Sequence, residues 1–384
     1  MTESVITHIT SAAERRRRYA ALRKAMRDAG LEALVIWSRG DEFLRGRVQY
    51  VSDIFQWAGW GIVVLPLDGE PAFVGDPLWS TARAEAVEWL GDIRQSGEPG
   101  PEVATILADR DAVSSVGLVG LADAAPAAHV RSLEQASPGT SFVDAGTLFD
   151  DVRSIKSDEE IENLRETSRI LLEVFDALAA EIRPGVPEWD ITGEAHRLCR
   201  QFGCVEGIVQ LGRPPFRYFS HGSSARLERE DVVVIDLEWG GPSGYWLELR
   251  RCFSFGRPSE AVRRFWDVRV ESYDATVDAI RPGIQAVDVL AARDAVYERH
   301  GFPIPTAPRY TIHGIGIDSL EPPWAPGNDR TLREGMVLSV HPDIVVSDPQ
   351  LRAQVGGITI SDNILVTAGG RERMTDEAVP WIEL

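Results

Sequence analysis

The sequence predicts a two-domain α/β protein. Its 384 residues, 44% of them hydrophobic, suffice for a large core that divides into two domains. Helix and strand patterns alternate as far as residue 150, and a second helical start then leads into paired strands. We therefore predict an amino-terminal α/β domain over residues 1–150 and a carboxy-terminal α/β (α+β) domain over residues 151–384.

The amino-terminal domain opens with a helical pattern over residues 11–28. The apolar run "LEALVIW" predicts a buried strand. "GIVVLPLDGEPAFVG" predicts a hairpin that turns at Asp68 and Gly69, and a helix is expected from Ser80. The basic run at residues 15–18 falls in the first helix, and we interpret it as a solvated face.

The carboxy-terminal domain begins at a strong helix signal. Ser157 and Glu160 have the spacing of a capping box, and the helical pattern runs toward Pro184. "IRPGVPEWDI" at residues 182–191 returns as "IRPGIQAVDV" at residues 280–289. We interpret this as an internal repeat of a helix, helix, strand, strand unit, although Pro and Gly are common after helices by chance. Such a repeat places two hairpins around a central cleft.

The first hairpin is "VVVIDLEWGGPSGYWLELRRCF", with a loop expected over residues 239–244. This loop places Asp236 opposite Glu248, so that two like charges lie roughly 5 Å apart. A metal ion, a cationic substrate, a shared proton or a neighbouring base would offset their repulsion. A solvated hairpin in a shifted register is the alternative.

The second hairpin is "MVLSVHPDIVV" followed by "GGITISDNILVT". His221, His313 and His341 fall beside the two hairpins or in the Gly-rich segment "YTIHGIGIDSLEPP", whereas the other four histidines lie in helical or terminal segments. Imidazole is both a near-neutral acid or base and the commonest metal ligand. Three histidines near two carboxylates therefore predict a functional site.

Composition excludes several classes of function. Forty basic residues against 59 acidic ones give a net charge of −19, which argues against binding to nucleic acid or to an anionic membrane. The sequence has no run of 18 apolar residues and no signal-peptide pattern at its start, so we expect a cytoplasmic protein. The three cysteines fit structural thiols in a reducing compartment.

The order of six segments resembles a known family. "FSHG", "VVVID", "GYWLELRRCF", "IHGIGI", "LREGMVLSVHP" and "GGITISDNILVT" follow one another as in the superfamily of creatinase, aminopeptidase P and methionine aminopeptidase. The resemblance covers residues 151 to about 375 and extends more weakly over the amino-terminal domain. It implies the pita-bread fold, with a pseudo-twofold repeat, and a homodimer.

The peptidases of that superfamily imply a dinuclear metal site of two Asp, one His and two Glu. Asp236 and His313 match this set, whereas Glu248 replaces the second Asp. His341 and Ser361 stand where the two Glu belong. Because a serine hydroxyl cannot replace the charge of a bridging carboxylate, we expect no two-metal peptidase.

Three functions remain open. The first, which we favour, resembles metal-free creatinase: a hydrolase of amidino, amide or ureido C–N bonds in a small polar metabolite. There Glu248 and Asp236 hold the substrate, His221 activates water, and His313 or His341 stabilises the intermediate. The second is a hydrolase or lyase with a single Fe, Mn or Zn bound by His313, His341 and Glu248, with Asp236 nearby. The third is a non-catalytic binding protein.

The remaining site candidates are assigned to substrate binding. Glu321 follows Leu320, which stands at the place of an assisting histidine in the family. Arg251 pairs with Asp236, with a substrate carboxylate, or within a structural ion pair. Tyr245 lines the cleft or packs in the core, and Trp57 packs in the core or stacks on substrate across a dimer interface.

Overall fold

The computed structural model describes residues 10–78, 87–110, 113–215, 221–304, 311–325, 327, 329–375 and 381–384. The chain divides into two compact units, Met1–Arg153 and Ser154–Leu384. The helix expected from Ser80 lies outside the described residues.

The first unit is built on a six-stranded sheet with the strand order β4-β3-β2-β1-β5-β6. The β1–β2 and β2–β3 pairs are antiparallel, whereas β3–β4, β1–β5 and β5–β6 are parallel. Its strands are β1 Ala33–Arg39, β2 Trp60–Pro66, β3 Ala72–Gly75, β4 Asp92–Gln95, β5 Ser115–Val119 and β6 Ser141–Asp144. Its helices are α1 Ala12–Asp28, α2 Gly46–Ser52, α4 Pro99–Ala108, α5 Ala127–Ala136 and α6 Gly146–Arg153.

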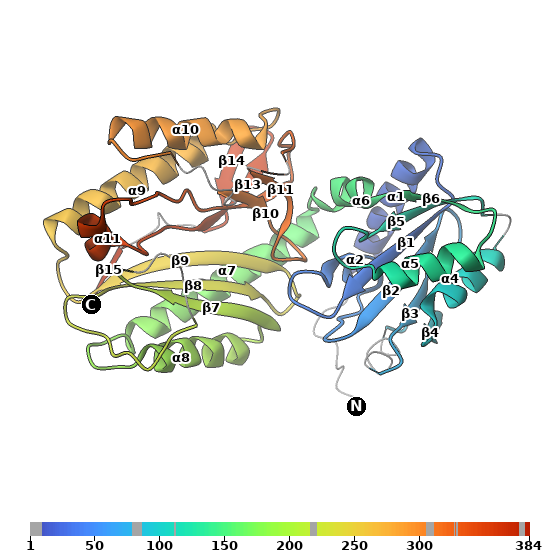
Figure 1. Ribbon diagram of the computed structural model, residues 1–384, viewed down its shortest axis with the longest axis horizontal. Coiled ribbons are helices and arrows are strands. Elements are labelled where there is room, and N and C mark those ends of the chain that lie inside the picture. The colour runs from blue at the N-terminus through green and yellow to red at the C-terminus, as the bar shows by residue number, and fades with distance from the viewer. Residues whose placement is uncertain are drawn as a thin grey trace. The chain divides into compact units, whose positions relative to one another are not determined.

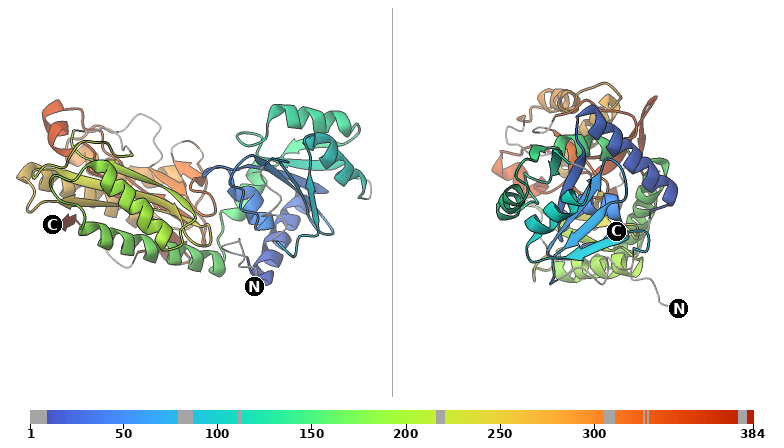
Figure 2. Two further views of the ribbon diagram at one scale, coloured as in Figure 1. Left: turned by 90° about the horizontal axis from the view of Figure 1, so that it is seen from below. Right: turned by 90° about the vertical axis from the view of Figure 1, so that its right-hand side faces the viewer.

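Alternating apolar residues fill both faces of this sheet. On one face, alternate residues of β1 and β2, such as Val35 and Ile62, pack with Val103 of α4 and Leu133 of α5 in one buried cluster. Helices α1 and α6 lie on the other side (Figure 2). The predicted β2–β3 hairpin is confirmed, and Gly69 in its turn has a φ of +93°, which favours glycine.

The second unit contains two sheets and two pairs of helices. The first sheet has the order β15-β9-β8-β7 and the second the order β11-β10-β12-β13-β14. Its helices are α7 Asp158–Ala179, α8 Glu188–Gln201, α9 Glu260–Ala279, α10 Ala286–Arg299 and α11 Pro349–Val355. Its strands are β7 Glu206–Gly212, β8 Val232–Gly240, β9 Trp246–Ser254, β10 Ile312–Gly314, β11 Glu321–Ala325, β12 Val337–Val340, β13 Asp362–Thr367, β14 Gly370–Arg373 and β15 Trp381–Glu383.

The repeat predicted from the sequence is visible in this unit. Helices α7 and α8 cover the sheet of β7, β8 and β9, and α9 and α10 cover the sheet of β10 to β14 (Figure 1). The capping box that begins α7 is confirmed, since Ser157 Oγ accepts from Glu160 N at 3.2 Å and Glu160 Oε2 accepts from Ser157 N at 2.9 Å. The mixed α/β architecture agrees with the fold class that the sequence predicts.

The register of the first hairpin differs from the expectation. Asp236 lies opposite Arg250, and Glu238 lies opposite Glu248. The cause is the loop, because β8 continues to Gly240 and the turn closes through a hydrogen bond from Gly241 N to Tyr245 O at 2.9 Å. A turn centre displaced by one residue moves opposing residues by two, which leaves both carboxylates on the same face.

Two further observations concern the cysteines and the length of the helices. Cys199, Cys204 and Cys252 are buried and form no disulfide. Within the described residues, no helix combines the length and the apolar character needed to cross a membrane.

Candidate metal centre

The candidate site lies where the inner faces of the two sheets of the second unit meet. In the second sheet, His313 of β10, Ser339 of β12 and Asn363 of β13 lie side by side in register. Directly opposed residues point to the same face of a sheet, so these three form one polar row. Their neighbours in sequence, including Ile312, Val340 and Ile364, point the other way into the apolar cluster beneath α9 and α10.

Glu248 of β9 meets this polar row from the first sheet. Its Oε2 accepts a hydrogen bond from Ser339 Oγ at 3.0 Å and lies 3.2 Å from His313 Nε2. Asn363 Nδ2 donates to the backbone oxygen of Glu248 at 2.8 Å. Since an antiparallel bridge also pairs Arg250 with Ser361, the strand that carries Glu248 is fixed against the second sheet by backbone as well as side-chain contacts.

Glu248, His313 and His341 form a compact group of possible metal ligands. One ligand atom from each lies within 4.8 Å of the others, and all three side chains are buried. His341 follows directly after β12, and its Nε2 is 3.9 Å from Glu248 Oε2. Two atoms bound to one zinc ion at tetrahedral angles are separated by roughly 3.3–3.6 Å, so these spacings suit a single transition metal.

The hydrogen bonding of His313 implies that a proton or a metal ion lies between its ring and Glu248. Its Nδ1 lies 2.9 Å from the backbone oxygen of Gly314, which can only accept, so Nδ1 carries the proton. In the neutral ring Nε2 then presents a lone pair to Glu248 Oε2. Two acceptors at 3.2 Å repel each other unless a proton or a metal ion lies between them.

The charges around Glu248 hold it ionised. Burial opposes this charge, but the charge of Arg250 and the hydrogen bond and charge of His313 outweigh burial and keep the pKa of Glu248 well below its ordinary value. For His313, burial is likewise outweighed, here by the hydrogen bond and charge of Glu248, so its pKa is raised. Burial lowers the pKa of His341 to about 4, so this ring is neutral near pH 7 and available as a ligand.

Arg250 supplies a fixed cation next to this group. Its guanidinium forms an ion pair with Glu248 Oε1 at 2.7 Å and donates from Nε to Asp236 Oδ2 at 3.0 Å. Asp236 is therefore held by Arg250 and lies outside the group of three possible ligands. Ser361, at the place of the bridging carboxylate expected from the resemblance, offers only a hydroxyl, 3.3 Å from Ser339 Oγ. These residues fit one metal ion and do not fit a second one.

Two carboxyl groups with raised pKa values complete the inner face of the first sheet. Burial, with help from Glu248 and against Arg250, raises the pKa of Asp236 to about 8. Burial and the charge of Glu248 raise the pKa of Glu238 to about 7. Glu238 also accepts a hydrogen bond from Ser319 Oγ.

Sequence reasoning missed Glu238 and Arg250. Residues two apart in a strand share a face, so the assignment of Asp236 and Glu248 to one face already implies both neighbours. The alternation of residues along "VVVIDLE" and "LELRR" is the sequence signal that identifies Glu238 and Arg250.

The structure does not bring His221 to the ligand group. Its side chain is exposed, and its backbone oxygen accepts from Thr192 Oγ1 of α8 at 2.9 Å. His221 lies near His196 of α8: the pKa of His196 is lowered by burial, by Arg200 and, to a smaller extent, by His221. The His196 ring in turn packs edge-on against Trp239, with ring centroids 5.3 Å apart. Within the described residues, no hydrogen bond or ion pair joins His221 to Glu248, His313 or His341.

The residues assigned to substrate binding have structural partners. Tyr245 donates from its hydroxyl to Glu160 Oε1 at 2.8 Å. Glu321 accepts from Lys156 Nζ at 2.5 Å and from the backbone N–H of Ile317 at 3.0 Å. Arg251 packs its guanidinium 5.6 Å from the ring centroid of Phe175, on the α7 side of the sheet. Trp57, in the first unit, is 51% exposed, so it is not a core residue of that unit.

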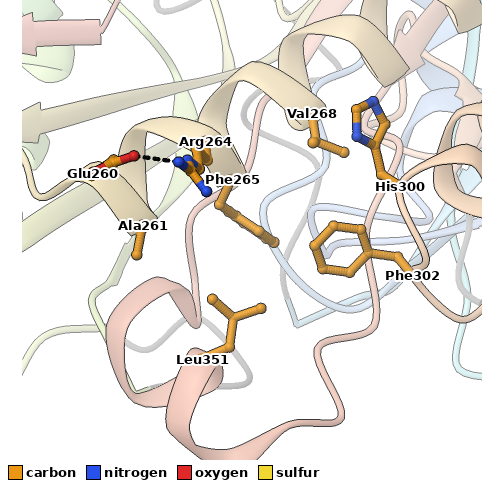
Figure 3. Close-up of a pocket in the computed structure, with 8 residues that line it drawn as sticks. All are labelled: Glu260, Ala261, Arg264, Phe265, Val268, His300, Phe302 and Leu351. Atoms are coloured by element: carbon orange, nitrogen blue, oxygen red, sulfur yellow. Dashed lines mark hydrogen bonds and ion pairs between the residues drawn. The ribbon is translucent and has the colours of Figure 1, made fainter.

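A cavity of about 560 Å³ lies elsewhere in the second unit, between α9, α11 and the segment after α10 (Figure 3). Apolar side chains of Phe265, Val268, Phe302 and Leu351 line it. None of the three possible ligands borders this cavity.

Comparison with known proteins identifies the relatives of this chain. Residues 162–368 match the model of metallopeptidase family M24, and residues 18–155 match that of the creatinase/prolidase N-terminal domain. The Xaa-Pro dipeptidase of Pyrococcus horikoshii is 26% identical over 270 residues, covering 69% of this chain and 74% of that protein. The probable dipeptidase PepE of Mycobacterium tuberculosis is 29% identical over 365 residues, covering 92% of both.

A solved structure agrees with these sequence matches. The crystal structure of dipeptidase PepE from Mycobacterium ulcerans superposes with a TM-score of 0.80 at 26% identity, over 98% of this chain and 99% of that one.

Proposed function

The chain belongs to metallopeptidase family M24, and we propose that it hydrolyses the amide bond of small peptides with one divalent cation bound by Glu248, His313 and His341. One observation carries the proposal. His313 Nε2 lies 3.2 Å from Oε2 of the ionised Glu248, and the neutral His341 lies beside them, so that two imidazoles and one carboxylate meet within 4.8 Å. The relatives named as dipeptidases support peptides of two residues as the substrate, with Xaa-Pro dipeptides as the first to test.

This proposal replaces the function favoured from the sequence. The expectation of a metal-free, creatinase-like hydrolase of a small polar metabolite is wrong, because the relatives are peptidases. The broader expectation of a hydrolase that acts on C–N bonds agrees with these relatives, because peptidases hydrolyse the C–N bond of a peptide. The same relatives favour an enzyme over a non-catalytic binding protein. A homodimer stays a prediction.

The chain's own residues divide the work of the reaction. The bound cation would activate a water molecule and polarise the peptide carbonyl. Glu248 contributes the negative charge, and Arg250 fixes the orientation of that carboxylate through Oε1 while leaving Oε2 toward the two imidazoles. Gly314 keeps the proton of His313 on Nδ1, so that Nε2 remains a ligand.

Glu238 is placed to carry the proton. It lies directly opposite Glu248 on the inner face of the sheet and is partly accessible, with Ser319 Oγ donating to its Oε1. A carboxyl group in this position accepts a proton from water at one step and returns it to the amine of the leaving residue at another. Within this proposal, Glu238 therefore replaces His221 as the acid and base.

The test is release of proline from Xaa-Pro dipeptides after the protein has been loaded separately with Mn²⁺, Co²⁺ or Zn²⁺. We expect turnover with at least one of these metals and a loss of roughly 100-fold or more in His341→Ala and Glu248→Gln. His300→Ala is the matched control, because this exposed histidine pairs with Glu271 away from the site. Unchanged turnover in His341→Ala, or no release of proline with any metal, would refute the proposal.

A further inference from the structure

The basic run near the start of the chain does not form a uniformly solvated helix face. Arg18 is 1% exposed, and its Nε pairs with Glu14 Oε1 at 2.7 Å. Arg17 pairs with the other oxygen of the same carboxylate at 2.7 Å. Arg17 and Arg18 therefore share one carboxylate within α1, whereas no ion pair joins Arg15 or Arg16 to a described residue.

Arg15 and Arg16 border a pocket in the first unit. The pocket has a volume of about 420 Å³. Its lining comes from α1, from the turn between β2 and β3 and from the segment before β4, and consists of Arg15, Arg16, Tyr19, Ala20, Arg23, Glu70 and Trp89. Three arginines against one glutamate give this lining a net charge of +2, in a chain whose own net charge is −19.

Arg15 is held in place by an aromatic ring. Its guanidinium carbon lies 4.1 Å from the centroid of the Trp89 ring. The indole is itself anchored, because Trp89 Nε1 donates to Asp53 Oδ2 at 3.2 Å and Thr10 Oγ1 donates to the other oxygen of that carboxylate at 2.5 Å. Stacking uses the face of a guanidinium and leaves its N–H donors, which lie in its plane, available to a ligand.

The donors of this pocket are largely uncommitted. The side chains of Arg15 and Arg16 make no hydrogen bond and no ion pair with a described residue, although the backbone N–H of Arg15 donates to Ser11 within the helix. Arg23 donates to the backbone oxygens of Pro66 and Gly69, which leaves its charge without a carboxylate partner in the described part of the chain. Arg110, which donates to the backbone oxygen of Glu70 at 2.9 Å, adds a further positive charge near Arg23.

We propose that this pocket binds a small molecule that carries a phosphate or pyrophosphate group. Planar guanidinium groups match the oxygens of a phosphate in pairs, and a lining charge of +2 offsets a phosphate dianion. A long nucleic acid is a poor ligand, because it would meet the acidic surface of the rest of the chain. The volume of about 420 Å³ suits a small ligand.

The test is isothermal titration of the full-length protein with inorganic pyrophosphate at low ionic strength. We expect saturable binding of one pyrophosphate per chain, at least tenfold weaker in the double variant Arg15→Gln, Arg16→Gln. Arg27→Gln is the matched control, since Arg27 is an exposed arginine on the same helix that does not line the pocket, and its affinity should equal that of the wild type.

Three results would overturn the proposal: no saturable binding, equal affinity in the double variant, or equal affinity for citrate at matched ionic strength. The last result would indicate attraction of any small polyanion. If circular dichroism shows that the double variant is unfolded, Arg16→Gln alone serves, because this exposed side chain contributes no described contact to the fold. Unchanged affinity in a folded Arg16→Gln variant would then count against the pocket.

Discussion

At the scale of single residues, Glu248 organises the candidate site. Its Oε2 meets His313 and Ser339, its Oε1 meets Arg250, and its backbone oxygen accepts from Asn363. A buried carboxylate with so many partners is stable only if positive charge compensates it. Arg250 supplies part of that charge permanently, and the remainder comes from a metal ion or a proton at His313.

Replacing Arg250 should therefore destabilise the fold. Arg250→Met leaves the buried carboxylates of Asp236 and Glu248 without their shared partner, and we expect a loss of about 3–5 kcal/mol in the free energy of unfolding of the metal-free protein. Urea denaturation measures this loss. Arg165→Met, which removes an exposed ion pair with Glu372, should cost less than about 1 kcal/mol. Equal stability of the two variants would contradict the role assigned to Arg250.

Tyr245 provides a second residue-level test, because its hydroxyl is committed to Glu160. Tyr245→Phe should lower the free energy of unfolding by about 1–3 kcal/mol through loss of a hydrogen bond to a charged group. Its kcat and KM for a dipeptide should stay within about twofold of the wild type, since the hydroxyl donates to Glu160 and not to a possible metal ligand. A tenfold rise in KM with unchanged stability would restore Tyr245 to the binding site.

At the scale of elements, strand alternation decides which residues share the site. The apolar cluster beneath α9 and α10 contains alternate residues of β10, β12 and β13, whereas His313, Ser339 and Asn363 between them contact Glu248. The sequence predicted the β8–β9 hairpin and the capping box of α7, because these depend on local turn and cap residues. The expected pairing of β12 with β13 is also present, although the connection between them contains α11. The sequence did not predict which residue opposes Glu248, because that pairing depends on where β8 ends, two residues farther along than expected.

Helix α1 gives an element-level prediction about pH. Burial would raise the pKa of Glu14, but hydrogen bonds from Arg17 and Arg18 outweigh burial and lower it from the ordinary value of 4.5. A carboxylate with a lowered folded pKa stabilises the protein above its unfolded pKa, and that contribution is lost as pH falls. The stability advantage of the wild type over Glu14→Gln should thus be full above about pH 4.5 and shrink below it.

Thermal denaturation of both proteins between pH 3 and pH 7 measures this difference. An advantage that grows as the solution becomes more acidic would mean that Glu14 is not held as a carboxylate by the two arginines. Glu102→Gln, in α4 of the same unit, is a control, because Glu102 is a less buried acid paired with Arg94.

At the scale of the whole molecule, the order of motifs along the chain predicted the family and the fold more reliably than the substitutions predicted the chemistry. Ser361 in place of a bridging carboxylate was interpreted as loss of the dinuclear metal site, and a metal-free hydrolase was favoured over an enzyme with one metal ion. In the structure, Ser361 forms a backbone bridge with Arg250. The guanidinium of Arg250 supplies a positive charge beside Glu248 and Asp236. Because a side-chain cation can compensate the carboxylates that a second metal would neutralise, a missing ligand does not by itself imply a metal-free reaction.

The metal content of the purified chain tests this account most directly. Protein prepared without chelator or a metal-binding tag, dialysed against excess Mn²⁺ or Zn²⁺ and then freed of unbound ion, should contain one metal ion per chain by elemental analysis. His341→Ala should contain little or none, and His300→Ala should match the wild type. Two ions per chain, or one ion that persists in His341→Ala, would contradict the single-metal site at Glu248, His313 and His341.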